Sequence, residues 1–250
     1  MIQYITSRKN KIVLDTIDLR KNKISNEKKL FVIEGEHLLE MALKANYVAY
    51  ILTNKHLNNI DDNIDQYIVT DDILSKISVS KSAPNVIAVC RYIDSKINNT
   101  KNILYLDNVQ DPGNVGTILR SSLAFSVFNV LLSDDSVSKY NEKVIQASQG
   151  SLFSLNIQTC NFKEIEQFKK IGYKVVVTVL SSESIKLNDF KFNDKDKYVL
   201  VVGNEGQGIR KDILSIADYR LFIEMKNIDS LNVGVATSIV LYKLSIDTNN

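Results

Sequence analysis

Residues 103–120 of this 250-residue chain are ILYLDNVQDPGNVGTILR, an apolar run followed by a polar loop and the start of a second apolar segment. The run at residues 103–106 predicts a strand, and a helix is expected over residues 115–124. Between them, residues 111–114 (DPGN) predict a turn, because proline fixes φ while glycine and asparagine tolerate left-handed backbone. α/β proteins bind ligands in such strand-to-helix loops, so residues 107–120 form a candidate site.

The same alternation of apolar runs and helical stretches continues to the end of the chain. Continuous apolar runs are typical of strands that are buried on both faces, so the sheet is predicted to be parallel and covered by helices. Residues 102–250 are therefore expected to form a Rossmann-like α/β domain. Further strands are expected at residues 129–133, 155–158, 174–179, 198–202 and 219–223, and helices at residues 142–149, 162–171 and 233–244.

A smaller α/β domain is predicted before this one. Residues 96–101 are polar and have no periodicity, which is typical of a linker. Residues 1–95 precede it and alternate between short strands and helices. The strands are expected at residues 30–33, 47–52 and 86–92, and the helices at residues 36–45 and 71–77.

The composition is that of an ordinary soluble globular protein, with 44% hydrophobic and 24% charged residues. The apolar runs are far shorter than the roughly 20 residues that a membrane-spanning helix needs. The first residues are polar and basic and lack the apolar stretch of a secretory signal, so a cytoplasmic protein is expected. Cys90 and Cys160 have no CxxC spacing and are predicted to be reduced structural thiols. With only two histidines in addition, no metal site is expected.

Positive charge is concentrated near the N-terminus. Residues 7–29 hold eight basic and three acidic side chains, an excess of five, whereas the whole chain has a net charge of only +2. Such a segment is either a phosphate-contacting patch or the solvated face of a helix with a flexible loop, and the charge count alone does not separate the two.

A second candidate loop, residues 203–208 (GNEGQG), directly follows a predicted strand. Its three glycines allow backbone amides to approach a ligand closely. The order differs from the GxGxxG of dinucleotide-binding loops, and Glu205 would bring negative charge to a pyrophosphate. The loop therefore suits a cationic ligand or a hydroxyl group better than a dinucleotide.

A third loop, residues 229–236 (DSLNVGVA), precedes a long apolar helix. Ser230 or Asn232 is expected to cap that helix. The small residues Gly234, Ala236 and Ser238 allow the helix to approach another backbone closely. A structural role alone explains this third loop.

Taken together, the three loops resemble the three sequence motifs of the SpoU (TrmH) family of SPOUT methyltransferases, in the same order. The resemblance covers residues 103–244, through DPGNVG up to Arg120, VGNEGQG at residues 202–208 and SLNVGVA at residues 230–236. Residues 31–35 (FVIEG) also resemble the family's N-terminal RNA-binding domain, which has a ribosomal-protein L30e-like α/β fold. Gly234 departs from the pattern, because the family often has serine there.

The resemblance implies an S-adenosylmethionine-dependent RNA 2′-O-ribose methyltransferase whose C-terminal sheet is tied into a trefoil knot and which forms a homodimer. It assigns Gly203, Gly206, Ile223 and Leu231 to the cofactor. It assigns Arg120 to phosphate anchoring or to activation of the 2′-hydroxyl, and it assigns positioning roles to Asn114, Glu205, Ser230 and Asn232. For an RNA enzyme, the basic N-terminal segment is expected to contact phosphates through Arg8, Lys9, Lys11, Lys21 and Lys23.

Large-subunit ribosomal RNA is the expected substrate, because the separate N-terminal domain resembles that of enzymes acting on this RNA. Transfer RNA is the alternative substrate within the family. A non-catalytic RNA-binding factor of ribosome assembly is the alternative from another functional class, and a nucleotide-dependent oxidoreductase is a weaker one.

Overall fold

A computed structural model describes residues 1–80, 82–181, 183–204 and 206–248. The chain divides into two compact units. The N-terminal unit comprises Met1–Asp94 and Tyr140–Phe153, and the C-terminal unit comprises Ser95–Lys139 and Ser154–Asn250. None of the helices in the described ranges is long and apolar enough to span a bilayer.

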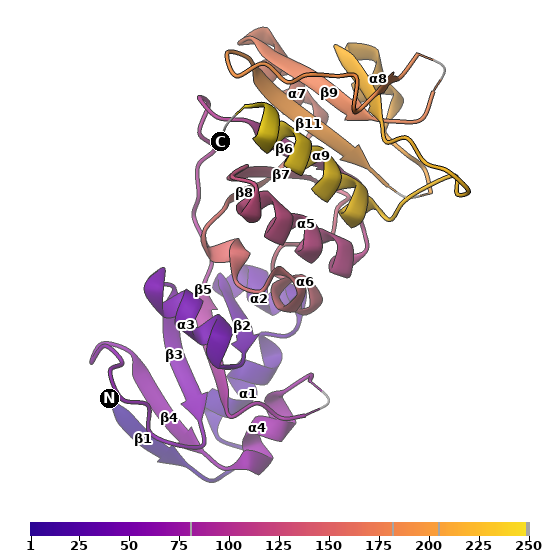
Figure 1. The fold of residues 1–250 in the computed structure, drawn as a ribbon. Helices are drawn as coiled ribbons and strands as arrows, with labels where there is room; N and C mark the ends of the chain where they lie inside the picture. The colour runs from indigo at the N-terminus through magenta and orange to yellow at the C-terminus, as the bar shows by residue number, and fades with distance from the viewer. Residues whose placement is uncertain (81, 182, 205, 249–250) are drawn as a thin grey trace. The chain divides into compact units, whose positions relative to one another are not determined.

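The N-terminal unit is built on a mixed five-stranded sheet in the order β1-β4-β3-β5-β2 (Figure 1). Strands β1, β3 and β4 are parallel, whereas β5 runs antiparallel to both β2 and β3. Its strands are β1 (Ile2–Ile5), β2 (Leu30–Glu34), β3 (Val48–Thr53), β4 (Asp65–Val69) and β5 (Val86–Arg91), and its helices are α1 (Lys11–Asp18), α2 (Asn22–Lys28), α3 (Glu36–Lys44) and α4 (Asp71–Ile77).

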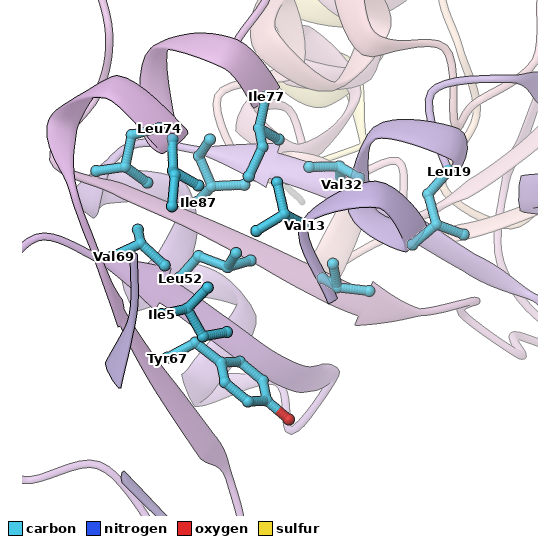
Figure 2. Packing of buried hydrophobic residues seen from close by; sticks show 12 residues of the cluster. Ile5, Val13, Leu19, Val32, Leu52, Tyr67, Val69, Leu74, Ile77 and Ile87 are labelled. Atoms are coloured by element: carbon cyan, nitrogen blue, oxygen red, sulfur yellow. The ribbon is translucent and has the colours of Figure 1, made fainter. Parts of the chain in front are cut away.

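One core of this unit lies between the sheet and two of its helices. Val13 of α1 and Leu74 and Ile77 of α4 pack against strand residues such as Leu52 and Ile87 (Figure 2). Each of these side chains is buried, which removes apolar surface from water and stabilises the layer arrangement. The predicted α/β class of residues 1–95 therefore agrees with the structure, although β1, β4, α1 and α2 were not predicted.

Helix α6 (Glu142–Ser148), which we predicted as part of residues 102–250, belongs to the N-terminal unit together with the short helix η1 (Ser151–Phe153). Aromatic contacts explain this placement. The Tyr140 ring stacks on Tyr92 with centroids 3.7 Å apart and lies 4.8 Å from the Phe31 ring. The Tyr140 hydroxyl also accepts a hydrogen bond from the Ile93 backbone N–H at 2.7 Å.

The C-terminal unit has a seven-stranded sheet in the order β10-β12-β9-β11-β6-β7-β8. All of these pairings are parallel, as predicted. The strands are β6 (Ile103–Asp107), β7 (Asn129–Ser133), β8 (Asn156–Cys160), β9 (Tyr173–Thr178), β10 (Ile185–Lys186), β11 (Lys197–Gly203) and β12 (Tyr219–Phe222), and the helices are α5 (Pro112–Ala124), α7 (Phe162–Lys170), α8 (Lys211–Ile216) and α9 (Val233–Asp247).

The middle of this sheet is buried on both faces, since every residue of β6 and β7 is buried. From β6 the chain continues to β7 and β8 on one side, whereas β11 pairs with β6 on the other side. In such parallel sheets, ligands bind beyond the carboxyl ends of the strands where the strand order reverses. The loops that follow β6 and β11 lie at this point, with Gly203 paired in register with Asp107.

Candidate active site

The first candidate loop leads directly into helix α5. The residues predicted as a turn instead form the start of this helix, which begins at Pro112 rather than at residue 115. Asp111 caps it, because its carboxylate accepts a hydrogen bond from the Asn114 backbone N–H at 2.8 Å. Proline suits the first helical position, where a backbone N–H would have no partner within the helix. The cap orients Asn114 at the beginning of α5.

The second loop folds back on itself after β11. The backbones of Asn204 and Gly208 exchange hydrogen bonds of 3.2 and 2.9 Å. The Asn204 side-chain oxygen accepts from the backbone N–H groups of Gly206 and Gln207 at 2.8 and 3.0 Å. A Cβ atom on Gly203 would lie 2.6 Å from the Gly208 backbone, so only glycine fits there. Glu205, a predicted catalytic residue, lies outside the described residues.

The third loop ends at the N-terminus of helix α9. Asn232 caps this helix by accepting hydrogen bonds from Gly234 and Val235 N–H groups at 2.9 and 3.2 Å, which confirms one of the two predicted caps. Ser230, the other predicted cap, is exposed two residues earlier. Figure 1 shows α9 running beside α5, and the two helices are in contact.

Side-chain amides connect the three loops. Asn232 Nδ2 donates to Asn114 Oδ1 at 2.8 Å, which joins the third loop to the first. Asn204 Nδ2 donates to the Asn108 carbonyl at 2.9 Å, which joins the second loop to the first. The structure therefore brings together Asn114 and Asn232, two predicted site residues that are far apart in the sequence. We did not predict the connecting roles of Asn108 and Asn204.

A cavity of about 260 Å³ lies beside the second and third loops. Three of the four predicted cofactor residues, Gly203, Ile223 and Leu231, line it, whereas Gly206 does not. Ser230 also lines the cavity. Most of the other lining side chains are apolar, among them Leu180, Leu221, Phe222, Met225 and Val233. Thr178 and Leu180, at the carboxyl end of β9, were missed, although the end of a parallel strand at this edge would have indicated them.

Arg120 lies on α5 outside the cavity lining. Its side chain is exposed and has no hydrogen-bond or ion-pair partner among the residues that the structure describes. A guanidinium without a partner is available to a phosphate, for which its planar fork of N–H donors is suited.

The predicted RNA-binding residues are exposed on the N-terminal unit. Two of them are neutralised within the chain, because Arg8 forms an ion pair with Asp72 and Lys21 lies 2.7 Å from Asp18. Lys9, Lys11 and Lys23 have no ion-pair partner within the described ranges. These three lysines therefore carry the charge that remains available to an anionic ligand.

Both cysteines are free thiols, as predicted, and both are buried. Burial raises the pKa of the Cys160 thiol to about 12, which keeps it protonated and unreactive at neutral pH. In the part of the chain that the structure describes, no group of three or more His, Cys, Asp or Glu side chains is placed to hold a metal ion.

Comparison with known proteins identifies the family. The model of the SpoU rRNA methylase family matches residues 101–242, which is more than half of the chain. The chain belongs to the SpoU rRNA methylase family. This match confirms the predicted family and the enzyme class that it implies, an RNA 2′-O-methyltransferase that uses S-adenosylmethionine.

Individual relatives of this SpoU protein act on different RNAs. The chain is 31% identical to the 23S rRNA (guanosine(2553)-2′-O)-methyltransferase RlmP of Bacillus subtilis, over 97% of this chain and 99% of that protein. It is 35% identical to the tRNA (guanosine(18)-2′-O)-methyltransferase of Aquifex aeolicus, but over only 56% of this chain and 67% of the relative. The crystal structure of an AdoMet-bound rRNA methyltransferase from Sinorhizobium meliloti has the same fold, with a TM-score of 0.88, 24% identity and 97% of each chain covered.

Proposed function

We propose that this SpoU protein transfers the methyl group of S-adenosylmethionine to a ribose 2′-hydroxyl of large-subunit ribosomal RNA. The observation that carries the proposal is the convergence of the three motif loops, which the Asn232–Asn114 and Asn204–Asn108 hydrogen bonds join, with the second and third loops lining one apolar cavity. Ribosomal RNA is favoured over transfer RNA because the similarity to RlmP includes the N-terminal unit, whereas the similarity to the transfer RNA enzyme covers little more than half of the chain.

The cavity suits the cofactor chemically. Ile223 and Leu231 would flank the adenine with apolar side chains, while the backbone near Gly203 would approach the ligand without a side chain in between. Gly206 is also proposed to contact the cofactor through the backbone of the second loop, although it does not line the cavity. When bound, S-adenosylmethionine supplies an electrophilic methyl group on a positively charged sulfur.

The chain's own residues must align the 2′-hydroxyl with that methyl group. The proton of the hydroxyl must also be accepted as the C–O bond forms, because a hydroxyl is a weak nucleophile at neutral pH. Asn114, Ser230 and Asn232 are proposed to orient the ribose, and Glu205 belongs to the same set. Arg120 is proposed to anchor a phosphate beside the reacting ribose. A guanidinium is normally a cation, so it suits the anchoring of a phosphate better than the acceptance of a proton.

An exposed apolar stripe on α9 supports the proposed homodimer. Val235, Ile239, Tyr242 and Ile246 are each between 36% and 55% exposed, and their spacing places them on one face of the helix. A second copy of this chain would cover that stripe with an identical one.

The remaining features of the proposal follow the family. The trefoil knot would be formed in the C-terminal sheet, and the insertion of β11 between β9 and β6 is compatible with it. The N-terminal domain, residues 1–95, would have the L30e-like fold and bind RNA, with residues 96–101 as linker. Residues 102–250 would supply the methyltransferase domain, apart from Tyr140–Phe153, which belongs to the N-terminal unit. The cytoplasm, where ribosomal RNA is found, is the compartment that this function requires.

The test is a methylation assay with labelled S-adenosylmethionine and either ribosomal or transfer RNA, followed by mapping of 2′-O-methyl sites in RNA from a deletion strain. Label in ribosomal RNA and one methyl site lost in the strain are expected. Label in transfer RNA alone would overturn the substrate assignment. Tight RNA binding without transfer to either RNA would instead indicate the non-catalytic assembly factor.

A further inference from the structure

A fully buried carboxylate, that of Asp107, lies at the carboxyl end of β6 beside the second motif loop. Its Oδ2 atom accepts a hydrogen bond from the Arg210 backbone N–H at 2.8 Å. Its Oδ1 atom lies 2.8 Å from Arg210 Nε, within ion-pair distance although without the alignment of a hydrogen bond. A buried charge is costly unless it is paired, so Asp107 needs Arg210.

Arg210 is held from a second direction as well. Its Nη2 atom donates to the Tyr105 hydroxyl at 2.8 Å, and Tyr105 is itself completely buried within β6. Burial raises the pKa of this phenol, which keeps it neutral and able to share its oxygen with the guanidinium. The Arg210 side chain therefore contacts two residues of strand β6, Tyr105 and Asp107.

Arg210 lies next to the second motif loop, close to the cavity. Arg210 directly follows Gly208 and Ile209, which line the cavity, and it immediately precedes helix α8. At the other end of the loop, Gly203 pairs in register with Asp107. Both ends of the second motif loop are thus held by Asp107. The N-terminal end is held through strand pairing, and the C-terminal end through the Asp107 side chain.

We infer that Asp107 and Arg210 are positioning residues for the cofactor, which fix the second motif loop as one wall of the cavity. This inference rests on the proposed function, because it assigns the cavity to S-adenosylmethionine. Without the Asp107–Arg210 contact, the C-terminal end of the loop would be mobile in the free protein. Cofactor binding would then have to order the loop, and this loss of conformational entropy would weaken the affinity for the cofactor.

The test measures S-adenosylmethionine binding by calorimetry for Asp107→Asn, Arg210→Lys and Tyr105→Phe. Asp107→Asn preserves volume and removes the charge, so loss of one charge-assisted contact is expected to raise the Kd by about tenfold. Arg210→Lys keeps the charge without the planar fork and should be intermediate. Tyr105→Phe removes only the hydroxyl and should have the smallest effect. In turnover, the KM for the cofactor should rise while the KM for RNA stays unchanged.

Lys169→Ala is the matched control. The Lys169 side chain is 37% exposed, like that of Arg210, and its Nζ lies 2.9 Å from Asp218 Oδ1 in the same unit but outside the cavity lining. Its loss should lower the melting temperature while the cofactor Kd stays within about twofold of the wild-type value. If Lys169→Ala and Asp107→Asn weaken cofactor binding equally, the inference is overturned, because both changes would then act through general destabilisation of the protein.

Two further outcomes separate this inference from the proposed function. If Asp107→Asn binds the cofactor as tightly as the wild type, the positioning role is wrong and the proposed function stands. If the wild-type protein itself binds no S-adenosylmethionine, the proposed function fails and the inference fails with it.

Discussion

Gly203, at the end of β11, and Gly234, in the first turn of α9, both belong to the sequence motifs, but their surroundings differ. A Cβ on Gly203 would lie 2.6 Å from the Gly208 backbone and 2.7 Å from Ile209 Cγ1, and backbone yields only at a high cost. A Cβ on Gly234 would lie 3.2 Å from Asn232 Oδ1 and 3.3 Å from Thr117 Cγ2, where small shifts suffice. The serine that the family often has at position 234 is therefore compatible with this packing after a slight adjustment.

Substitution by alanine should reduce the stability of the protein more at Gly203 than at Gly234. Gly203→Ala is expected to destabilise the protein by about 1–3 kcal/mol through overpacking and to weaken cofactor binding. Gly234→Ala should change stability by less than about 1 kcal/mol, because the better helix propensity of alanine offsets the closer contact. Urea denaturation checks both values, and a larger loss for Gly234→Ala would contradict the prediction.

Substitution of Arg120 by alanine tests its proposed role as a phosphate anchor. Arg120→Ala should lower methylation by about 10²-fold, because a ribose whose phosphate is no longer anchored is misplaced relative to the methyl group, while cofactor binding by calorimetry is retained. Its side chain is exposed, so the free energy of unfolding should change by no more than about 0.5 kcal/mol. Loss of cofactor binding in this variant would show that the residue belongs to the cavity instead.

At the scale of elements, helix α9 carries both the third motif and the exposed stripe of Val235, Ile239, Tyr242 and Ile246. Ile239→Lys combined with Tyr242→Lys should convert the proposed dimer to a monomer, because four desolvated charges would lie at the symmetric interface. Analytical ultracentrifugation measures the change. Ile171→Lys, which alters an isoleucine that is 55% exposed directly after α7, should leave the proposed dimer intact.

The elements also show which parts of the fold were predictable from the sequence. The strands of the C-terminal sheet with continuous apolar runs were found, because burial on both faces leaves a strong pattern. Strand β4 (DQYIV) was missed since it begins with two polar residues, and the two-residue strand β10 is too short to give any pattern. In the site, capping by Asn232 was predictable from local chemistry, whereas the contact of Asp107 with Arg210 joins residues that only the folded sheet brings together.

At the scale of the whole molecule, the basic N-terminal segment gives a prediction about RNA affinity. Replacing Lys9, Lys11 and Lys23 together with glutamine should weaken RNA binding and reduce the slope of log K against log salt by about 2–3, because each phosphate contact contributes roughly 0.7–0.9. Cofactor binding should be unchanged. Glutamine at Lys44 and Lys55, which pair with Glu40 and Glu36, is the control, and an unaltered salt slope in the triple variant would contradict the prediction.

Helix α6 has a consequence for how this chain is made. Domains generally fold as units during synthesis, the N-terminal one first. Here the N-terminal unit includes Tyr140–Phe153, which is translated after β6, α5 and β7 of the other unit. A nascent chain that has emerged only as far as Asp94 still lacks the Tyr140 ring that covers Phe31 and Tyr92. The N-terminal unit is thus completed only after the first strands of the methyltransferase sheet have left the ribosome, so its folding is coupled to theirs in time.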